Sequence, residues 1–326
     1  MITINILKCI FLLLGGLGVF MFGMKYLSTS LTENSASKMK SLMTKVTDKA
    51  INGIFTGAAV TASIQSSSAT TVMVVGFVNA GMMTLLQATY MILGANIGTT
   101  LTGFIISLES LPITHFLTIM TLIGFVGKTA RKKEKPLIIF DILIGLGMIF
   151  MGLYTMSNSM KGFADTPQIK ELFLMTTNPA ILFIISMLAT ALIQSSSAGT
   201  GIVMSFASGG LMNLESALYC ILGMNVGTCV TALLASAGTS LNGKRAAIIH
   251  LMFNLIGGAE FFVLLLIPQT KNLIFALFPK ESITVSIAVF NFAFNLISTL
   301  TVAPFAKQFV RFVEIISSGK RQRKKT

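Results

Sequence analysis

Two short polar runs interrupt apolar stretches of this chain and are its most chemically distinctive segments. The runs are Gln65-Ser66-Ser67-Ser68 and Gln194-Ser195-Ser196-Ser197. Each is followed by a motif rich in Gly, Asn and Thr, GANIGTT from Gly94 and GMNVGTC from Gly223. Hydroxyls and amides in apolar surroundings cost free energy unless they are satisfied. Their clustering therefore predicts a polar binding site.

The surrounding sequence limits what such a site can bind. No charged side chain occurs between residues 50 and 108 or between residues 172 and 214. A bound cation would meet neutral oxygens, which suit a hard ion such as sodium. A bound anion would meet hydroxyls, backbone N–H groups and the positive ends of helices. Neither ion is neutralised by the protein alone, which favours binding both together.

The composition indicates a membrane protein. Of 326 residues, 53% are hydrophobic and only 11% are charged, against about 25% charged residues in soluble domains. The net charge of +13 comes from short clusters between apolar runs, as in cytoplasmic loops, so we expect no nucleic-acid partner. The three cysteines have no CxxC spacing and are expected to be inert apolar residues.

The apolar runs predict an all-α polytopic protein with about seven full spans. They cover residues 6–27, 85–107, 113–130, 137–158, 215–237, 246–267 and 283–305. Two further runs, 51–80 and 179–212, are divided by the Gln-Ser-Ser-Ser segments into arms too short to cross the roughly 30 Å bilayer core. We expect each to be a re-entrant helical hairpin. The polar stretches 31–50 and 159–178 should be interfacial helices or connectors that lead into the hairpins.

Loop charges orient the predicted spans. One side holds 19 of the 24 Lys and Arg residues, Lys25 among them, and the positive-inside rule makes it cytoplasmic. The C-terminus is then inside and the N-terminus outside, in a bacterial-type cytoplasmic membrane. The basic tail 307–326 should contact anionic membrane lipid.

The chain matches itself at an offset of 129 residues. Between 61–102 and 190–231, 23 of 42 positions are identical, and Gly16 and Gly23 align with Gly145 and Gly152. Each unit has three crossings, so the second copy is inverted, as in many secondary transporters. We expect a first repeat over 1–130, an inverted second repeat over 131–267, and an extra span with the basic tail over 268–326.

The Gly-x-Asn-x-Gly segments of these motifs, residues 94–98 and 223–227, lie inside the spans 85–107 and 215–237. Each Gly weakens a helix by roughly 1 kcal/mol. We therefore expect both spans to be broken there, adding free backbone groups to the site.

The paired QSSSA runs, each followed by GANIGTT or GMNVGTC, resemble the type II sodium–phosphate cotransporter family over about residues 14–258. The resemblance implies sodium-coupled transport of inorganic phosphate, with both QSSS segments lining the sodium and phosphate sites. The implied site residues, whose division between the ions stays open, are Gln65, Ser66, Ser67, Ser68, Asn96, Thr99, Gln194, Ser195, Ser196, Ser197, Asn225 and Thr228.

The leading hypothesis is therefore a sodium-coupled phosphate transporter that works by alternating access. The alternatives are transport of another oxyanion, phosphate export, a channel, or an intramembrane serine hydrolase, which would need a base beside its serine. No ATP-binding motif or organic cofactor is indicated, and sodium is the expected coupling ion. The apolar surface would permit a homodimer.

Four other polar residues attract attention within or beside the spans. Glu260 is an intramembrane carboxylate, for which we favour a structural role over a functional one. Asp141, His115 and His250 are expected at the membrane interface.

Overall fold

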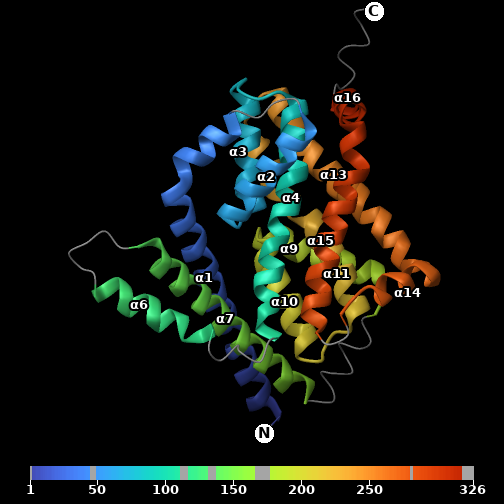
Figure 1. Ribbon diagram of the computed structural model, residues 1–326. Coiled ribbons are helices and arrows are strands. Elements are labelled where there is room, and N and C mark those ends of the chain that lie inside the picture. Colours follow the sequence, from blue (N-terminus) through green and yellow to red (C-terminus); the bar gives the residue numbers. More distant parts are fainter. Residues whose placement is uncertain are drawn as a thin grey trace, which may run out of the picture.

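The computed structural model describes residues 2–44, 49–110, 117–130, 137–165, 177–279 and 282–317, and this part of the chain is helical (Figure 1). The elements are α1 (Ile2–Thr44), α2 (Ala50–Ile64), α3 (Ser67–Asn79), α4 (Leu85–Ser107), η1 (Leu108–Ser110), α6 (Met120–Ala130), α7 (Ile138–Ala164), α9 (Pro179–Ile193), α10 (Ser196–Ser208), α11 (Leu214–Gly227), α12 (Cys229–Ser236), α13 (Leu241–Leu266), α14 (Pro268–Ala276), α15 (Ile283–Val302), η2 (Ala303–Phe305) and α16 (Ala306–Ser317).

Six described helical segments are long and apolar enough to cross a membrane. They cover 6–31, 85–107, 138–164, 214–236, 241–266 and 283–317, so the all-α polytopic fold is confirmed. The predicted span 113–130 begins outside the described residues, and α6 within it is too short to count. The start of α1 and the end of α16 lie at opposite ends of the molecule (Figure 1).

The two predicted hairpins are present as pairs of short apolar helices. In the first, α2 and α3 meet at Gln65-Ser66, and in the second, α9 and α10 meet at Gln194-Ser195. The first hairpin is closed near its turn by a hydrogen bond of 2.9 Å from the Thr61 hydroxyl to that of Thr70. Neither arm is long enough to span a bilayer.

Each hairpin packs closely on the helix that follows it, and the packing repeats at the 129-residue offset. A Cβ atom at Gly94 would collide with the carbonyl oxygen of Ile54, and one at Gly223 with that of Phe183. Ile54 and Phe183 are themselves 129 residues apart. The two units therefore share one internal packing arrangement.

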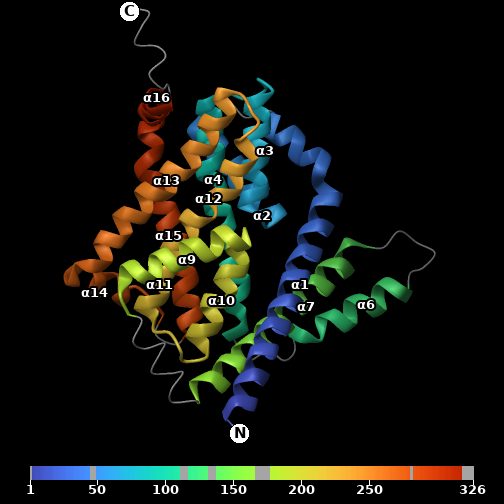
Figure 2. The ribbon, with the colours of Figure 1, turned by 180° about the vertical axis from the view of Figure 1, so that it is seen from behind.

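Helices α1 and α7 cross and pack against each other on one side of the molecule (Figures 1 and 2). A Cβ at Gly16 would lie 2.9 Å from the Gly152 oxygen, and one at Gly23 would lie 2.9 Å from the Gly145 oxygen. Because Gly16 corresponds to Gly145 and Gly23 to Gly152, each glycine meets the counterpart of the other. Self-complementary contacts of this kind are those of a two-fold axis.

Large buried side chains form two main cores. One includes Phe20, Phe150, Phe290 and Phe294, and thus joins α1 and α7 to α15. The other joins α3 and α4 to α13 and α16. The hairpin turns lie between elements that these cores hold in place.

The predicted breaks in the spans are largely wrong. Helix α4 runs without interruption through Gly94–Thr100, and the second copy is interrupted only at Thr228, whose backbone stays right-handed helical. The glycines allow close approach to the hairpin instead of unwinding. The side-chain amides of Asn96 and Asn225 donate to the carbonyls of Ile92 and Ile221 one turn earlier, at 2.9 and 2.8 Å.

The stretch 31–50 was expected to be an interfacial helix or a connector, and its described part is mostly helical. Helix α1 continues to Thr44, well past the apolar span. Residues 45–48 lie outside the described part of the chain, as do residues 166–176 of the second predicted connector. The described start of that second stretch belongs to α7.

Candidate binding site between the two hairpins

The glutamine of each polar run ends one helix and the next serine begins another. Gln65 (φ 57°, ψ 27°) and Gln194 (φ 56°, ψ 27°) both adopt the left-handed conformation. They are the two non-glycine residues with positive φ among those described. Such a residue stops a helix, because its backbone cannot continue the right-handed path.

The serine that follows caps the second helix of each hairpin. The Ser66 hydroxyl accepts a hydrogen bond from the backbone N–H of Ala69, and the Ser195 hydroxyl accepts one from that of Ala198, both at 3.2 Å. Ser, Thr, Asn and Asp favour this position because they satisfy an N–H that the helix leaves free. The Gln-Ser pair thus builds a turn at the tip of an apolar hairpin.

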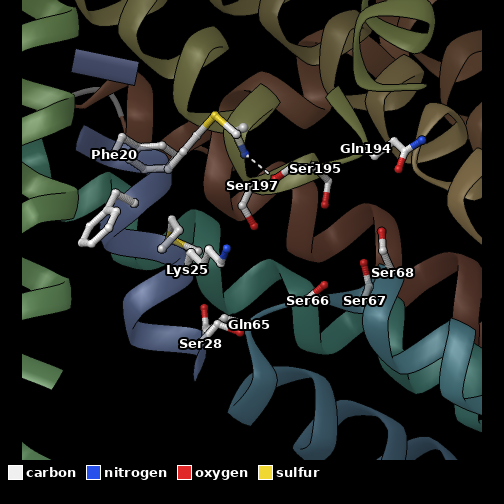
Figure 3. Close-up of a pocket in the computed structure, with 15 residues that line it drawn as sticks. Phe20, Lys25, Ser28, Gln65, Ser66, Ser67, Ser68, Gln194, Ser195 and Ser197 are labelled. Carbon is white, nitrogen blue, oxygen red and sulfur yellow. Dashed lines mark hydrogen bonds between the residues drawn. The ribbon is translucent and has the colours of Figure 1, made fainter. Parts of the chain in front are cut away.

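Both turns line one cavity of about 420 Å³ (Figure 3). Helix α1 completes its wall. The lining residues are Phe20, Met21, Phe22, Met24, Lys25, Ser28, Gln65 to Ser68 and Gln194 to Ala198. All eight residues of the two polar runs therefore meet in space, although 125 or more residues separate them in the sequence.

The two glutamines differ in their surroundings. The Gln65 side chain is 6% exposed and accepts a hydrogen bond of 2.9 Å from the Thr102 hydroxyl of α4. Its amide also donates to the carbonyl of Ala62. Gln194 is exposed, and the hydroxyl of Thr231, the counterpart of Thr102, has no hydrogen-bond partner within the described part of the chain. The first turn is therefore anchored to its span more firmly than the second.

A second, much smaller polar cavity of about 10 Å³ lies beside the second turn. Its volume is about that of one water-sized sphere. It is lined by Thr99, Thr102, Ser196, Ser197, Thr200, Met224, Asn225 and Asn291. Residues from both repeat units and from α15 thus surround one small polar space.

A cluster of buried amides supports the wall of this small cavity. The Asn225 amide donates to the Asn291 side-chain oxygen at 3.2 Å, and the Asn295 amide donates to the same oxygen at 3.0 Å. The first bond links α11 to α15, and the second lies within α15. Asparagine pairs of this kind are typical of polar contacts between membrane helices.

Ten of the twelve predicted site residues line one of the two cavities. They comprise the eight residues of the polar runs together with Thr99 and Asn225. Asn96 and Thr228 line neither and instead bond to carbonyls of their own helices, Thr228 to Met224 at 2.9 Å. Spacing alone could not distinguish Asn225, which donates to Asn291 of α15, from Asn96, which donates to the carbonyl of Ile92 in its own helix.

Sequence reasoning missed one charged residue of the site. Lys25 was assigned to a cytoplasmic loop, but it lies inside α1 and lines the larger cavity. The signal was present in the spacing, since Met21, Met24, Lys25 and Ser28 follow the i, i+3, i+4, i+7 pattern of one helix face. Among the residues that line this cavity, Lys25 is the charged one.

The other polar residues singled out in the sequence lie elsewhere. Asp141 accepts hydrogen bonds from Tyr26 and Lys128, both at 2.6 Å, and so joins α7 to α1 and α6. His250 is 1% exposed and therefore packed inside the protein, and its expected place at the membrane interface stays a prediction. Glu260 lines neither cavity. His115 lies outside the described residues.

The electrostatics of the site suit an anion together with a hard cation. Hydroxyls, amides and the starts of α3 and α10 face the larger cavity, and helix N-termini attract anions. No cluster of His, Cys, Asp and Glu that could hold a metal occurs among the described residues. The neutral oxygens around the smaller cavity are ligands of the kind that alkali and alkaline-earth ions accept.

These features define an all-α polytopic membrane protein whose two related hairpins meet at a polar cavity. The model of the family "Na+/Pi-cotransporter" matches the chain twice, over residues 19–158 and 154–299. The chain belongs to this family. The two matches also agree with the internal duplication.

Named relatives extend the comparison. "Uncharacterized protein YqeW" of Bacillus subtilis is 31% identical over 92% of this chain and 96% of its own length. "Putative inorganic phosphate export protein YjbB" of Salmonella typhimurium is 26% identical over 93% of this chain, which spans 55% of that protein. "Sodium-dependent phosphate transport protein 2A" of Ovis aries is 39% identical over 28% of this chain and 15% of its own length. No solved structure matches the chain significantly.

Proposed function

We propose that this protein is a sodium-coupled secondary transporter of inorganic phosphate that works by alternating access. Membership of the Na+/Pi-cotransporter family supports phosphate as the substrate class. The observation that carries the proposal is the meeting of both Gln-Ser-Ser-Ser turns at one cavity of about 420 Å³. Such a volume falls within the usual range for small-molecule sites.

Phosphate is proposed to bind in the larger cavity, facing the hydroxyls of the two turns. Ser67 and Ser196 lie at the first positions of α3 and α10, where free backbone N–H groups also point. These groups can donate several hydrogen bonds to an oxyanion without any metal cofactor.

Sodium is proposed to bind at the smaller cavity. Its wall offers hydroxyls of Thr99, Thr102, Ser196, Ser197 and Thr200 and the amide oxygen of Asn225. Ser196 and Ser197 also line the larger cavity. A cation there would stabilise an anion next to it, which gives a physical reason for coupling the two.

The two-fold exchange of contacts between α1 and α7 supports the proposed pair of inverted repeats, 1–130 and 131–267, followed by residues 268–326. In inverted repeats the two halves can exchange conformations, which opens the site to the opposite side. We extend the proposal to a C-terminus on the cytoplasmic side and an N-terminus outside, in a bacterial-type cytoplasmic membrane. Contact of the basic tail with anionic lipid and formation of a homodimer belong to the same proposal.

Export is the second candidate direction, because relatives carry the name of an inorganic phosphate export protein. A serine hydrolase is less well supported, since no histidine or carboxylate is among the residues lining the larger cavity. The direction depends on the ion gradients in the cell as well as on the protein.

The test is uptake of radiolabelled phosphate into proteoliposomes that contain the purified protein. Uptake should require an inward sodium gradient and should disappear when potassium replaces sodium. Ser67→Ala and Ser196→Ala should each reduce uptake by about tenfold or more, because a hydrogen bond to a charged group contributes about 1.5–3 kcal/mol.

Ser63→Ala is the matched control. Its hydroxyl lies on the same hairpin but bonds to the Ala59 carbonyl at 2.8 Å and does not line either cavity. Uptake that ignores sodium would overturn the coupling. Uptake of sulfate but not phosphate would overturn the substrate and keep the site.

A further inference from the structure

The larger cavity contains a positive charge that the polar runs do not supply. Lys25 lies on α1, within the candidate span 6–31, and lines the cavity together with both turns. Figure 3 shows its amine extending toward the space between the Gln65-Ser66 turn and Ser197. Residues 50–108 and 172–214, which form the rest of the hairpin region, have no charged side chain at all.

Lys25 lies inside the candidate span 6–31 and not at its end. A charged side chain within a membrane span costs free energy unless it faces a water-filled cavity or reaches the interface. Lys25 shares its helix face with Met21, Met24 and Ser28, and all four line the cavity. The face of α1 that carries the charge is therefore the face turned toward the two hairpins.

The second repeat has no equivalent charge. The residue 129 positions after Lys25 is Tyr154, and no residue of α7 lines the larger cavity. The charge thus enters the site from one repeat only. A role in the general packing of the duplicated fold would not require this asymmetry.

We infer that Lys25 is an anion-binding residue of this cavity, where it neutralises one negative charge of the bound oxyanion. This deepens the proposed function and rests on it for the identity of the anion. A monoanionic phosphate would be neutralised by Lys25 alone, and a dianionic one would need one further cation. The ammonium group therefore replaces one of the sodium ions that a site of neutral oxygens alone would require.

The inference can be tested by binding, independently of transport. Thermal unfolding of the purified protein would be followed in an uncharged detergent without phospholipid, so that no lipid headgroup supplies the phosphate. Phosphate should raise the unfolding temperature of the wild type, since a ligand that binds the folded state stabilises it. Sodium chloride at the same ionic strength corrects for screening.

Lys25→Gln should raise the phosphate concentration needed for half of this stabilisation by about tenfold or more, from the loss of one close charge. Lys25→Arg should keep this phosphate concentration within about threefold of the wild-type value. Lys8→Gln is the matched control, because Lys8 is an exposed lysine of the same helix that does not line the cavity. Lys8→Gln should behave as the wild type.

Measuring the same variants in the proteoliposome assay distinguishes a failure of this inference from a failure of the proposed function. Lys25→Gln should raise the KM for phosphate and steepen the dependence of uptake on sodium. Phosphate stabilisation in the wild type without uptake would overturn the transport proposal and leave the role of Lys25 standing. An unchanged phosphate dependence in Lys25→Gln, or no stabilisation and no uptake in the wild type, would overturn the inference.

Discussion

The two hairpin turns have nearly the same sequence and the same backbone, but their side chains have different surroundings. Gln65 and Gln194 share φ and ψ to within a degree, and both following serines cap their helices at 3.2 Å. Gln65 is nevertheless buried and bonded to Thr102, whereas Gln194 is exposed. Identical local sequence thus fixes the turn, while the packing around the turn differs between the halves.

This difference has a direct consequence for the proposal that the two repeats are inverted halves. If the halves exchange conformations, the state open to the other side should have Gln194 bonded to Thr231 and Gln65 released. The unpartnered Thr231 hydroxyl found here is then the vacant partner of that second state. The two halves should therefore share the glycine contacts of their hairpins and differ in the hydrogen bonds of their glutamines.

The largest losses of stability are expected from substitutions at the close contacts that both halves share. Gly94→Ala and Gly223→Ala should each destabilise the protein by more than about 3 kcal/mol, because the new Cβ would collide with a backbone oxygen of the adjacent hairpin. Thermal unfolding in detergent measures this. Gly76→Ala, where no other atom lies within 4 Å of the new Cβ, is the control. A wild-type unfolding temperature for either the Gly94 or the Gly223 variant would contradict the close packing.

Substitution of the glutamines should affect stability unequally. Gln65→Ala should cost about 1–3 kcal/mol, since it leaves the buried Thr102 hydroxyl without its acceptor. Gln194→Ala should change stability by less than about 0.5 kcal/mol, because the side chain is exposed. The comparison is made on the unfolding temperatures of both variants. Equal losses would mean that the two turns are equally anchored.

Substitution of the two threonines should change the stability of the protein differently. Thr102→Val should destabilise by about 1–2 kcal/mol, whereas Thr231→Val removes an unpartnered buried hydroxyl and should be neutral or stabilising. Uptake should nevertheless fall in Thr231→Val, because the second state loses its hydrogen bond. Full uptake in Thr231→Val would argue against the exchange of states.

The smallest effect concerns a carboxyl that only the first repeat has. Glu109 in η1 corresponds to Gly238 in the second repeat. Burial raises the pKa of Glu109 above its ordinary value of 4.5, and a hydrogen bond with Ser157 and the charge of Lys161 offset part of this.

A raised pKa means that the folded state keeps its proton to higher pH than the unfolded chain. The stability linked to this group is therefore present at acidic pH and is lost as the pH rises from about 4.5 through the folded-state pKa. Glu109→Gln should remove this slope and raise stability at neutral pH by less than about 1 kcal/mol. Unfolding temperatures of wild type and variant from acidic to neutral pH measure the change, and parallel curves would contradict it.

Much of this molecule was predictable from its sequence. Apolar length identified the spans, the polar interruptions identified the hairpins, and the offset of 129 residues identified the duplication. These are local or periodic properties. A turn such as Gln65-Ser66 forms because a left-handed residue and a capping hydroxyl stand next to each other, which needs no information from the rest of the chain.

The helical state of the Gly-x-Asn-x-Gly segments was predicted wrongly, and the reason lies in the tertiary structure. In isolation two glycines weaken a helix. In the folded chain the same glycines let a hairpin approach, and the surrounding packing keeps residues 94–100 helical. The sequence shows where glycines lower the helix propensity. It does not show whether a neighbouring helix packs closely against those glycines.

The sequence by itself determined the two polar turns, their helices and their repetition, because hydrophobicity, capping and backbone preference act over a few residues. Only the tertiary structure decided that both turns share one cavity, that Asn225 faces Asn291 while Asn96 does not, and that Lys25 joins the site. The physical reason is that these properties depend on which helix faces meet. Similar sequence in the two halves does not determine these contacts, because each half packs against different neighbours.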